Sequence, residues 1–453
     1  MKPFPAIISC ILAIVVYSAN LPQHEVFVVW LCTYFIIDFI DNFGKSIWQI
    51  LDLMIISALI TWTLAPLAAY HYFNDQNTLA ILWDKTMRVD SITYYSFVLP
   101  AVIALIFGLK APFLTKRSYK FDIDDLRKSG ILNRPPKVGY NLLGISFLAT
   151  LVSPFVPASL AFVVFLLNKL SVVGILYLYF SGKKSNNIFL ILAMVIIIIP
   201  SIRSGMFGEM VYLFILGGLI LSQGNRLTFI TKSFIFVICI FSIVLLQSIK
   251  GDFRKVAWND VDNSNKSGYF ISLLSQRILT PNEIYKEDIL FNIVVRSNQG
   301  WLISATMDNI PKVVPFSNGK PIWLSIMGSI VPRFLWPDKP KSGGAANLKR
   351  YLGWDLKGTS MNVSPLGEAW ANFGWFGGIF YMFLYGLFFR VVFGFILKLI
   401  SQIPTLIIWL PLLFMYVVVT ESDLLSNLNH LTKSSIFIFI MYKAYKSIFK
   451  ISL

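Results

Sequence analysis

Long apolar runs separated by short polar breaks dominate this chain of 453 residues. A helix that crosses a bilayer needs about 20 mostly apolar residues, and about twelve runs approach or exceed that length. They lie near residues 4–19, 26–40, 47–69, 93–109, 139–155, 158–180, 187–202, 206–222, 233–249, 373–397, 404–420 and 432–449. The pattern predicts an all-α polytopic membrane protein with about 12 transmembrane helices.

A polar segment interrupts this pattern between residues 250 and 372. It predicts three parts: N-terminal transmembrane helices over 1–249 (about nine), a long loop over 250–372, and C-terminal transmembrane helices over 373–453 (about three). Within the loop, 287–310 and 321–330 carry apolar residues at helical spacing and are bounded by proline. We expect amphipathic helices there, at the membrane surface or dipping into it.

Composition agrees with a membrane protein, because 56% of the residues are hydrophobic and only 14% are charged. Soluble domains carry about 25% charged residues. The three cysteines, Cys10, Cys32 and Cys239, all lie inside apolar runs and are interpreted as small hydrophobic residues. No cysteine or histidine pattern typical of a metal site occurs in the sequence, so we expect neither a metal nor another cofactor.

The net charge of +16 is best explained by membrane topology, since cytoplasmic loops are enriched in Lys and Arg. The loop over 110–138 holds eight such residues, and the short loops that alternate with it are basic as well. We therefore expect that side to be cytoplasmic, with both termini cytoplasmic and the 250–372 loop extracytoplasmic. No nucleic-acid partner is needed to explain the charge.

The long loop is itself cationic, with 15 Lys and Arg against ten Asp and Glu. Topology does not require this excess, because long loops escape the positive-inside rule. Anionic lipid headgroups, an anionic substrate or a simply solvated basic loop would each account for it.

Several cations stand at places where a plain surface charge is unusual. Arg203 follows Pro200 between two apolar runs, Lys250 and Arg254 flank Asp252 where a run ends, and Arg296 lies among apolar neighbours. Each one is either a side chain that reaches to the membrane interface or part of a functional site.

Two further stretches place ionisable side chains next to prolines or glycines. In "VPRFLWPDKP" (331–340), prolines restrict the backbone around Arg333 and Lys339, and such cations suit phosphate recognition. In "SPLGEAWANFG" (364–374), Glu368 precedes Asn372 by about one helical turn. Glu368 is a candidate general base, or a carboxylate favoured at a helix start. His430, which follows Glu421 and Asp423, is interpreted as an exposed loop residue.

These motifs resemble the bacterial oligosaccharide repeat-unit polymerases, also called O-antigen or Wzy-type polymerases. The resemblance rests on "PR-x-x-W-P-x-K-P" over 332–340, on "S-P-x-G-E-x-x-x-N-F-G-x-x-G" over 364–377, on the exit "K-x-D-x-R" over 250–254, and on Arg203 after its turn. The membrane topology of the whole chain is similar too.

The resemblance implies a lipid-linked glycosyltransferase with a GT-C-like fold. Its substrates would be two undecaprenyl-diphosphate-linked oligosaccharides on the outer leaflet of the inner membrane, joined there into O-antigen, capsule or exopolysaccharide. Arginines and lysines would bind the diphosphate and Glu368 would act on the acceptor hydroxyl, with Asp252 and Asn372 as further site residues. The expected diphosphate ligands are Arg203, Lys250, Arg254, Arg296, Arg333 and Lys339. A chain-length regulator is a further candidate partner, beside membrane lipids.

Two alternatives remain open at this point. An O-antigen ligase needs the same cations on the same side, although a histidine expected in its outer loop is absent from 250–372. A flippase or other transporter of lipid-linked oligosaccharide also has about 12 helices, but such folds usually show related halves.

Overall fold

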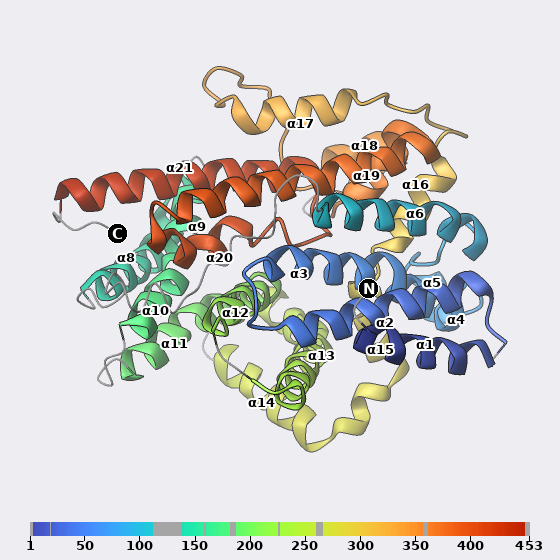
Figure 1. Cartoon of the computed structure of the whole chain (residues 1–453), viewed down its shortest axis with the longest axis horizontal. Helices are drawn as coiled ribbons and strands as arrows, with labels where there is room; N and C mark the ends of the chain where they lie inside the picture. The colour runs from blue at the N-terminus through green and yellow to red at the C-terminus, as the bar shows by residue number, and fades with distance from the viewer. Residues whose placement is uncertain are drawn as a thin grey trace.

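The computed structural model describes residues 3–18, 20–111, 137–157, 160–181, 187–224, 227–259, 266–356 and 361–448. Over these ranges the chain forms helices and turns without a β-strand, as expected for an all-α protein (Figure 1). The first part contains α1 (Pro3–Ser18), α2 (Gln23–Asn42), α3 (Gln49–Ala58), the π-helix η1 (Leu59–Leu64), α4 (Ala65–Tyr72), α5 (Thr78–Leu82), α6 (Ser91–Lys110), α8 (Lys137–Val152), η2 (Ser153–Phe155), α9 (Ala161–Asn168), α10 (Leu170–Phe180), α11 (Asn187–Ser204), α12 (Gly208–Leu221) and α13 (Phe229–Asn259). The second part contains α14 (Lys266–Leu279), η4 (Pro281–Tyr285), α15 (Glu287–Ser297), α16 (Gly300–Asn309), α17 (Lys320–Ile330), α18 (Ala345–Leu352), α19 (Ser364–Ile400), η5 (Pro404–Trp409), α20 (Leu410–Phe414) and α21 (Leu424–Ile448).

By length and composition, 7 helical segments of the described chain can cross a membrane. They are Gln23–Asn42, Gln49–Tyr72, Ser91–Lys110, Lys137–Phe155, Ala161–Phe180, Phe229–Trp258 and Ser364–Ile400. Three further apolar helical segments, α1, α12 and the continuous η5–α20, are shorter. The chain is therefore a helical membrane protein, and the seven segments coincide with seven of the predicted runs.

The two predicted boundaries of the polar segment fall within helices. Helix α13 continues past residue 249 to Asn259, and α19 starts at Ser364 rather than near 373. Gly374 has φ 64° and ψ −153°, which kinks α19 between a short first part that carries Glu368 and Asn372 and a long apolar second part. Residues near both boundaries are thus held by helices rather than by loops.

Close backbone contact fixes α19 against α6. A Cβ atom on Gly108 would lie 2.3 Å from the carbonyl oxygen of Phe383, and one on Gly386 would lie 2.5 Å from that of Leu105. Glycines allow two helices to approach this closely in a membrane, where packing rather than the hydrophobic effect drives association. The pair anchors the helix that carries Glu368.

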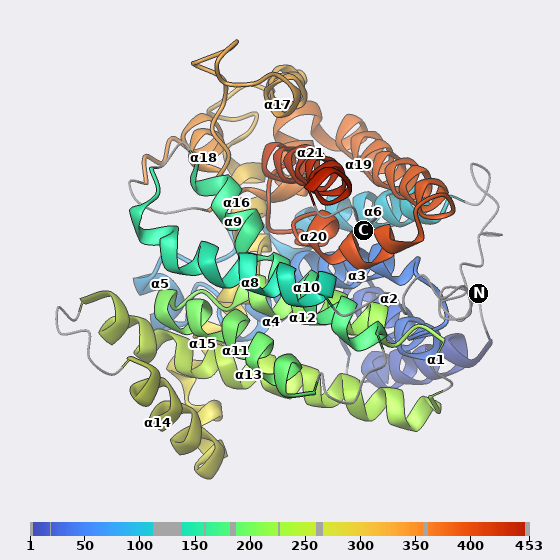
Figure 2. The ribbon, with the colours of Figure 1, turned by 90° about the vertical axis from the view of Figure 1, so that its left-hand side faces the viewer.

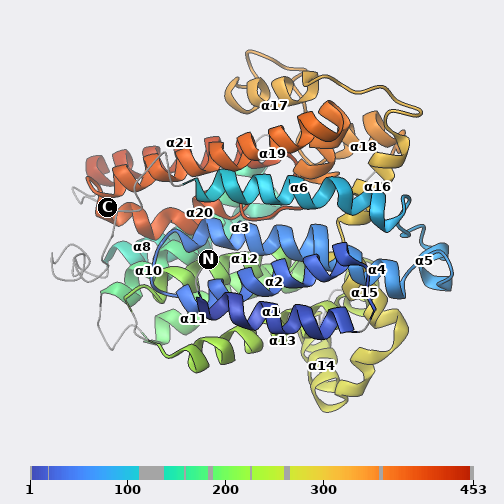
Figure 3. The same ribbon diagram turned by 45° about the vertical axis from the view of Figure 1, so that its right-hand side comes forward.

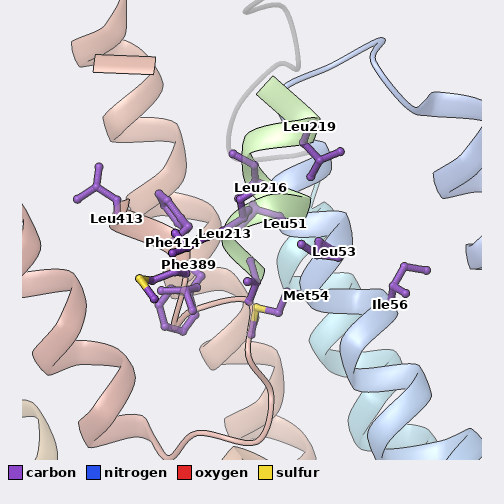
Figure 4. Packing of buried hydrophobic residues seen from close by; sticks show 14 of the residues in the cluster. Leu51, Leu53, Met54, Ile56, Leu213, Leu216, Leu219, Phe389, Leu413 and Phe414 are labelled. Atoms are coloured by element: carbon purple, nitrogen blue, oxygen red, sulfur yellow. The ribbon is translucent and has the colours of Figure 1, made fainter. Parts of the chain in front are cut away.

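The centre of the molecule is a core shared by α3, α12, α19 and α20 (Figure 4). Met54, Leu216, Phe389 and Phe414 are buried there and meet from four different helices. Because η5 and α20 enter this core, the chain that follows them, residues 415–423, runs through the interior. That placement brings a short polar turn, 420–423, into the bundle.

The helices of the predicted long loop gather on one end and on two sides of the bundle. α14, α15, α16 and α18 lie toward one end, and the C-terminal end of α21 lies at the other (Figure 3). α17 and α13–α14 lie on opposite sides in both Figure 1 and Figure 2. The expected helix over 287–310 is split into α15 and α16, whereas the one over 321–330 is α17. Most of the basic 110–138 loop, residues 112–136, lies outside the described residues.

Candidate functional site

A cavity of about 340 Å³ lies between α3–η1, α12 and α13. Most of its wall is apolar, with Phe39, Phe214, Phe236 and Ile243 among the lining residues. Along α13 the lining runs from residue 232 to residue 247, which is about 22 Å at the rise of an α-helix. The cavity is thus long and mostly apolar, with Lys232 among its lining residues at one end of this stretch.

One end of this cavity is polar. Ser57, Thr61, Tyr212, Arg296 and Glu421 all line it there. Hydroxyl groups of Ser57 and Thr61 lie 2.9 Å and 3.0 Å from the Thr420 hydroxyl, beside Glu421. Four separate parts of the chain, α3–η1, α12, α15 and the 420–423 turn, therefore build this end.

A break between two helices positions Arg296. The N–H of Gln299 donates to the carbonyl oxygen of Thr61, 3.0 Å away, in the π-helix η1. Gly300 packs so closely that a Cβ atom there would lie 2.4 Å from Pro66 Cγ and 2.6 Å from Tyr94 Oη. A π-helix in a longer helix often marks a functional site. Here it holds the end of α15 against the bundle and turns Arg296 toward the cavity.

Arg296 lines the polar end of the cavity, and Lys250 and Arg254 lie near Arg296 without lining the cavity themselves. Arg296 Nη2 lies 2.9 Å from Glu421 Oε2. Lys250, only 8% exposed, lies in the electrostatic field of Arg296, Arg254 and Glu421. Lys250 and Arg254 are one turn apart on α13 and so share a face. We call Lys250, Arg254, Arg296 and Glu421 the cavity cluster.

The turn before α12 is held against the same face of α13. Arg254 Nε donates to the carbonyl oxygen of Gly205, 2.9 Å away, and its guanidinium lies 4.6 Å from the Trp258 ring centre. Arg203 lies two residues before Gly205, at the end of α11. Its side chain lies outside the described part of the chain, so its expected role stays a prediction.

Asp252 is not brought to this cluster. Its carboxylate pairs with Lys255 at 3.1 Å, and 45% of its side chain is exposed. Two residues along an α-helix correspond to a rotation of about 200°, so Asp252 faces away from Lys250 and Arg254. The geometry gives no support to a catalytic role for Asp252.

Glu368 and Asn372 lie inside the bundle, on the first part of α19. Glu368 is fully buried, and its oxygens accept from Asn347 Nδ2 at 2.8 Å and from the Leu424 N–H at 3.0 Å. Asn372 donates to Tyr351 Oη at 3.1 Å, while its own buried Oδ1 has no partner among the described residues. Both candidates are thus fixed in one polar network.

Asp423 is the second carboxylate of this network. It is 2% exposed, its Oδ1 accepts from the Ser426 N–H at 2.8 Å, and its charge acts on Glu368. Burial raises the pKa of Asp423 above its usual range. Asp423 also lines a small cavity of about 20 Å³ beside Arg350, whereas Glu368 does not. Such a cavity has room for about one water molecule or one hydroxyl group.

Arg333 and Lys339 stand apart from both groups. Lys339 Nζ donates to the carbonyl oxygens of Gly328 and Val331, both at 2.7 Å, and Arg333 Nη1 donates to that of Pro337 at 2.9 Å. Their neighbour is Lys433 of α21, which packs against α17. The structure therefore divides the expected diphosphate ligands between two places.

The sequence reading missed the role of the 420–423 turn. In the sequence, Glu421 and Asp423 stand out only as neighbours of His430, and their partners lie far away along the chain. The reading of His430 as an exposed loop residue is wrong: it is 2% exposed, belongs to α21, and its Nε2 donates to the Leu412 carbonyl oxygen at 2.7 Å. Helix α20 ends early, so the turn enters the bundle and α21 begins sooner than expected.

Among the residues that the structure describes, no group of three or more His, Cys, Asp or Glu side chains is placed to hold a metal ion. Residues 11–399 match the family described as a domain of unknown function (DUF8712). No curated protein and no solved structure matches the chain. Since the match covers far more than half of the chain, the protein belongs to the DUF8712 family.

Proposed function

We propose that this protein is a polymerase that joins undecaprenyl-diphosphate-linked oligosaccharide repeat units into a bacterial surface polysaccharide. Lipid-linked substrates have a long apolar chain and an anionic head, and they stay in the membrane. The observation that carries the proposal is the cavity of about 340 Å³, whose wall is mostly apolar and which is lined by Arg296 at one end and by Lys232 at the other end of the α13 stretch. Its shape and its chemistry both fit such a lipid.

The cavity cluster would bind the diphosphate. Arg296 is about half exposed, with 47% of its side chain accessible, so it can exchange Glu421 for a ligand. Lys250 and Arg254 add positive charge that is already in place. Fixed cations stabilise the charge that builds up on a leaving diphosphate, and the loss of one such donor costs about 100-fold in rate.

The reaction is a substitution at a sugar carbon. The acceptor hydroxyl oxygen forms a bond to the anomeric carbon while the bond from that carbon to the diphosphate oxygen breaks. The diphosphate leaves with the electron pair, and a carboxylate takes the hydroxyl proton. We assign the proton to the Glu368–Asp423 pair: Asp423 faces the small cavity, and Glu368 holds the turn through the Leu424 N–H.

The proposal includes a topology. Adding α1, α12, η5–α20, α11 and α21 to the seven candidate spans would give about twelve crossings and a GT-C-like fold. The protein would lie in the inner membrane with both termini cytoplasmic and the helices α14 to α18 on the outer side. The basic short loops support this orientation. A chain-length regulator would act on the polymer outside the cavity.

Deletion of the gene tests the function directly. A polymerase mutant should lose the ladder of long chains on a polysaccharide gel and keep a single repeat unit on its surface lipid. Loss of all surface glycan would instead indicate a ligase or a flippase.

Complementation tests the site. Arg296→Ala should lower polymer formation by about 100-fold at equal protein level, as expected for one lost donor. Lys312→Ala is the matched control, because Lys312 is an exposed cation paired with Asp308 at the end of α16. Long chains at the wild-type level in the Arg296→Ala strain would refute the diphosphate assignment.

A further inference from the structure

A second set of cations lies on the other side of the bundle from the cavity cluster. It consists of Arg333 and Lys339 in the loop after α17, and Lys433 on α21. Burial lowers the pKa of Lys339, and the nearby charges of Lys433 and Arg333 lower it further, so the three repel one another. α17 and α13 lie on opposite sides (Figures 1 and 2), which separates this set from the first one.

The protein holds these cations in place by neutral contacts. Lys339 Nζ donates two hydrogen bonds to carbonyl oxygens, Arg333 donates one, and Lys433 Nζ lies 4.5 Å from the Phe162 ring centre. An ammonium group has three N–H donors, so one remains on Lys339 for another acceptor. Among the described residues, none of the three cations forms an ion pair. Asp338 lies in the same loop but is exposed and unpaired with them.

The surface around this set is apolar. Phe334 is 81% exposed and Leu335 is 68% exposed, directly beside Arg333, and Ile330 and Trp323 of α17 are exposed as well. Exposed apolar side chains next to fixed cations suit the border between lipid chains and lipid headgroups. A soluble anion would account for the cations but not for these side chains.

We propose that Arg333, Lys339 and Lys433 form a second binding site for the phosphate or diphosphate head of a lipid. Resting on the proposed function, we assign this site to the second lipid-linked substrate, the acceptor. The reaction needs two such lipids at once. The Glu368–Asp423 pair lies near both cationic sets: Glu421 of the same turn pairs with Arg296, and Asp423 lines the small cavity together with Pro340, which follows Lys339.

Native mass spectrometry of the full protein in detergent, with undecaprenyl diphosphate as the probe, tests this site. The wild type should bind two lipids. The Arg333→Ala/Lys433→Ala variant should bind one, with the second at least tenfold weaker, and Arg296→Ala should lose the other. Lys339 stays unchanged because it holds the loop. Lys312→Ala is the control, and thermal unfolding verifies that each variant is folded.

The outcomes separate the two proposals. A wild type that binds one lipid, lost only in Arg296→Ala, overturns the second site and leaves the proposed function intact. Displacement of the second lipid by equimolar phosphatidylglycerol overturns the acceptor assignment, since the site is then one for phospholipid headgroups. Two lipids bound with the expected losses, but no polymer made by the wild type from repeat-unit lipids, supports the second site and refutes the polymerase.

Discussion

The two cationic regions differ in how their charge is balanced. In the cavity cluster, Arg296 pairs with Glu421 at 2.9 Å, and both residues line one end of a mostly apolar cavity. In the second region, Arg333 and Lys339 are held by carbonyl oxygens, and the apolar side chains beside them face outward. A carboxylate such as Glu421, which an anionic ligand can displace from Arg296, suits a site that binds and releases substrate in each catalytic cycle. A set of fixed cations without a carboxylate partner suits a site that binds an anionic ligand without first breaking an ion pair.

The difference also separates two kinds of lipid contact. The cavity would contact a lipid chain from several helices, whereas an exposed apolar surface leaves most of the chain in contact with other lipids. We therefore expect the cavity to hold its lipid more tightly and more selectively. The following predictions test this contrast.

Gly300→Ala should have the largest effect on lipid binding at the cavity cluster and no effect at the Arg333, Lys339 and Lys433 set. The new Cβ atom would overlap Pro66 and Tyr94, so the end of α15 must shift and carry Arg296 with it. We expect lipid binding at the cavity and polymer formation to fall by about tenfold or more, since small displacements of a positioned group cost that much. Lipid binding at Arg333 and Lys433 should not change.

Gly217→Ala is the control for this change. It lies in helix α12, where a Cβ atom would meet no atom within 4 Å. Alanine at an open helical position stabilises by about 0.5–1 kcal/mol. Equal binding at the cavity in Gly300→Ala and Gly217→Ala would show that the α15–α16 break does not position Arg296.

Ile243→Trp should narrow the cavity without touching its charges. Ile243 lines the cavity on α13, and a larger side chain there would occupy the space of a lipid chain. Overpacking costs about 1–3 kcal/mol, so we expect binding of undecaprenyl diphosphate at this site to weaken by about fivefold to 100-fold. Ile238→Trp adds the same ring on the outer face of α13, where Ile238 is 47% exposed, and should leave binding unchanged. Equal losses in both variants would argue against a lipid in the cavity.

Raising the salt concentration should change lipid affinity at the two regions by different but smaller amounts. Exposed charges are screened beyond about 10 Å at 0.1 M salt, while partly buried pairs are screened much less. Each region has one exposed cation, Arg333 or Arg296, and one buried lysine, but only Arg296 is paired with a partly buried carboxylate. Raising the salt from 0.05 M to 0.5 M should therefore weaken the second site by about twofold to fivefold more than the cavity site. The same titration, read by native mass spectrometry after buffer exchange or by fluorescence with a labelled lipid, would contradict the contrast if both sites weakened alike.

The sequence predicted the helical membrane fold because apolar runs of sufficient length leave few alternatives. Of the expected diphosphate ligands, Lys250, Arg254 and Arg296 lie near one another, although α13 and α15 are separated by α14. It could not separate Arg333 and Lys339 from them, because helix packing, not spacing along the chain, places α17 against α21.

The interior turn was the hardest part to predict. Glu421 meets Arg296, and Asp423 acts on Glu368, across 125 and 55 positions of the chain. Nothing near 420–423 marks these partners, and the break of the apolar run before Leu424 was the available signal. The split at 298–299 was equally hidden, because it depends on the contact of Gly300 with Pro66 and Tyr94.

Substitution of Asp423, in the 420–423 turn, should give the smallest effect, and this effect is on thermal stability. Burial raises the pKa of its carboxyl in the folded protein, so folding favours the neutral form. That stability is fully present below the unfolded pKa of about 3.9 and is lost as the pH rises through the folded pKa. Asp423→Asn is neutral at every pH and keeps an oxygen that can accept from the Ser426 N–H.

We therefore expect Asp423→Asn to melt a few degrees higher than the wild type at pH 8, with the difference disappearing toward pH 4. Thermal unfolding of both proteins in detergent across this range measures it. Asp252→Asn is the control, because Asp252 is an exposed carboxylate paired with Lys255 and its loss should change little. A variant that melts below the wild type at pH 8 would mean that Asp423 is held charged by the cations around it. The 420–423 turn would then supply negative charge to both regions. The Arg333, Lys339 and Lys433 set would no longer differ from the cavity cluster in lacking a carboxylate.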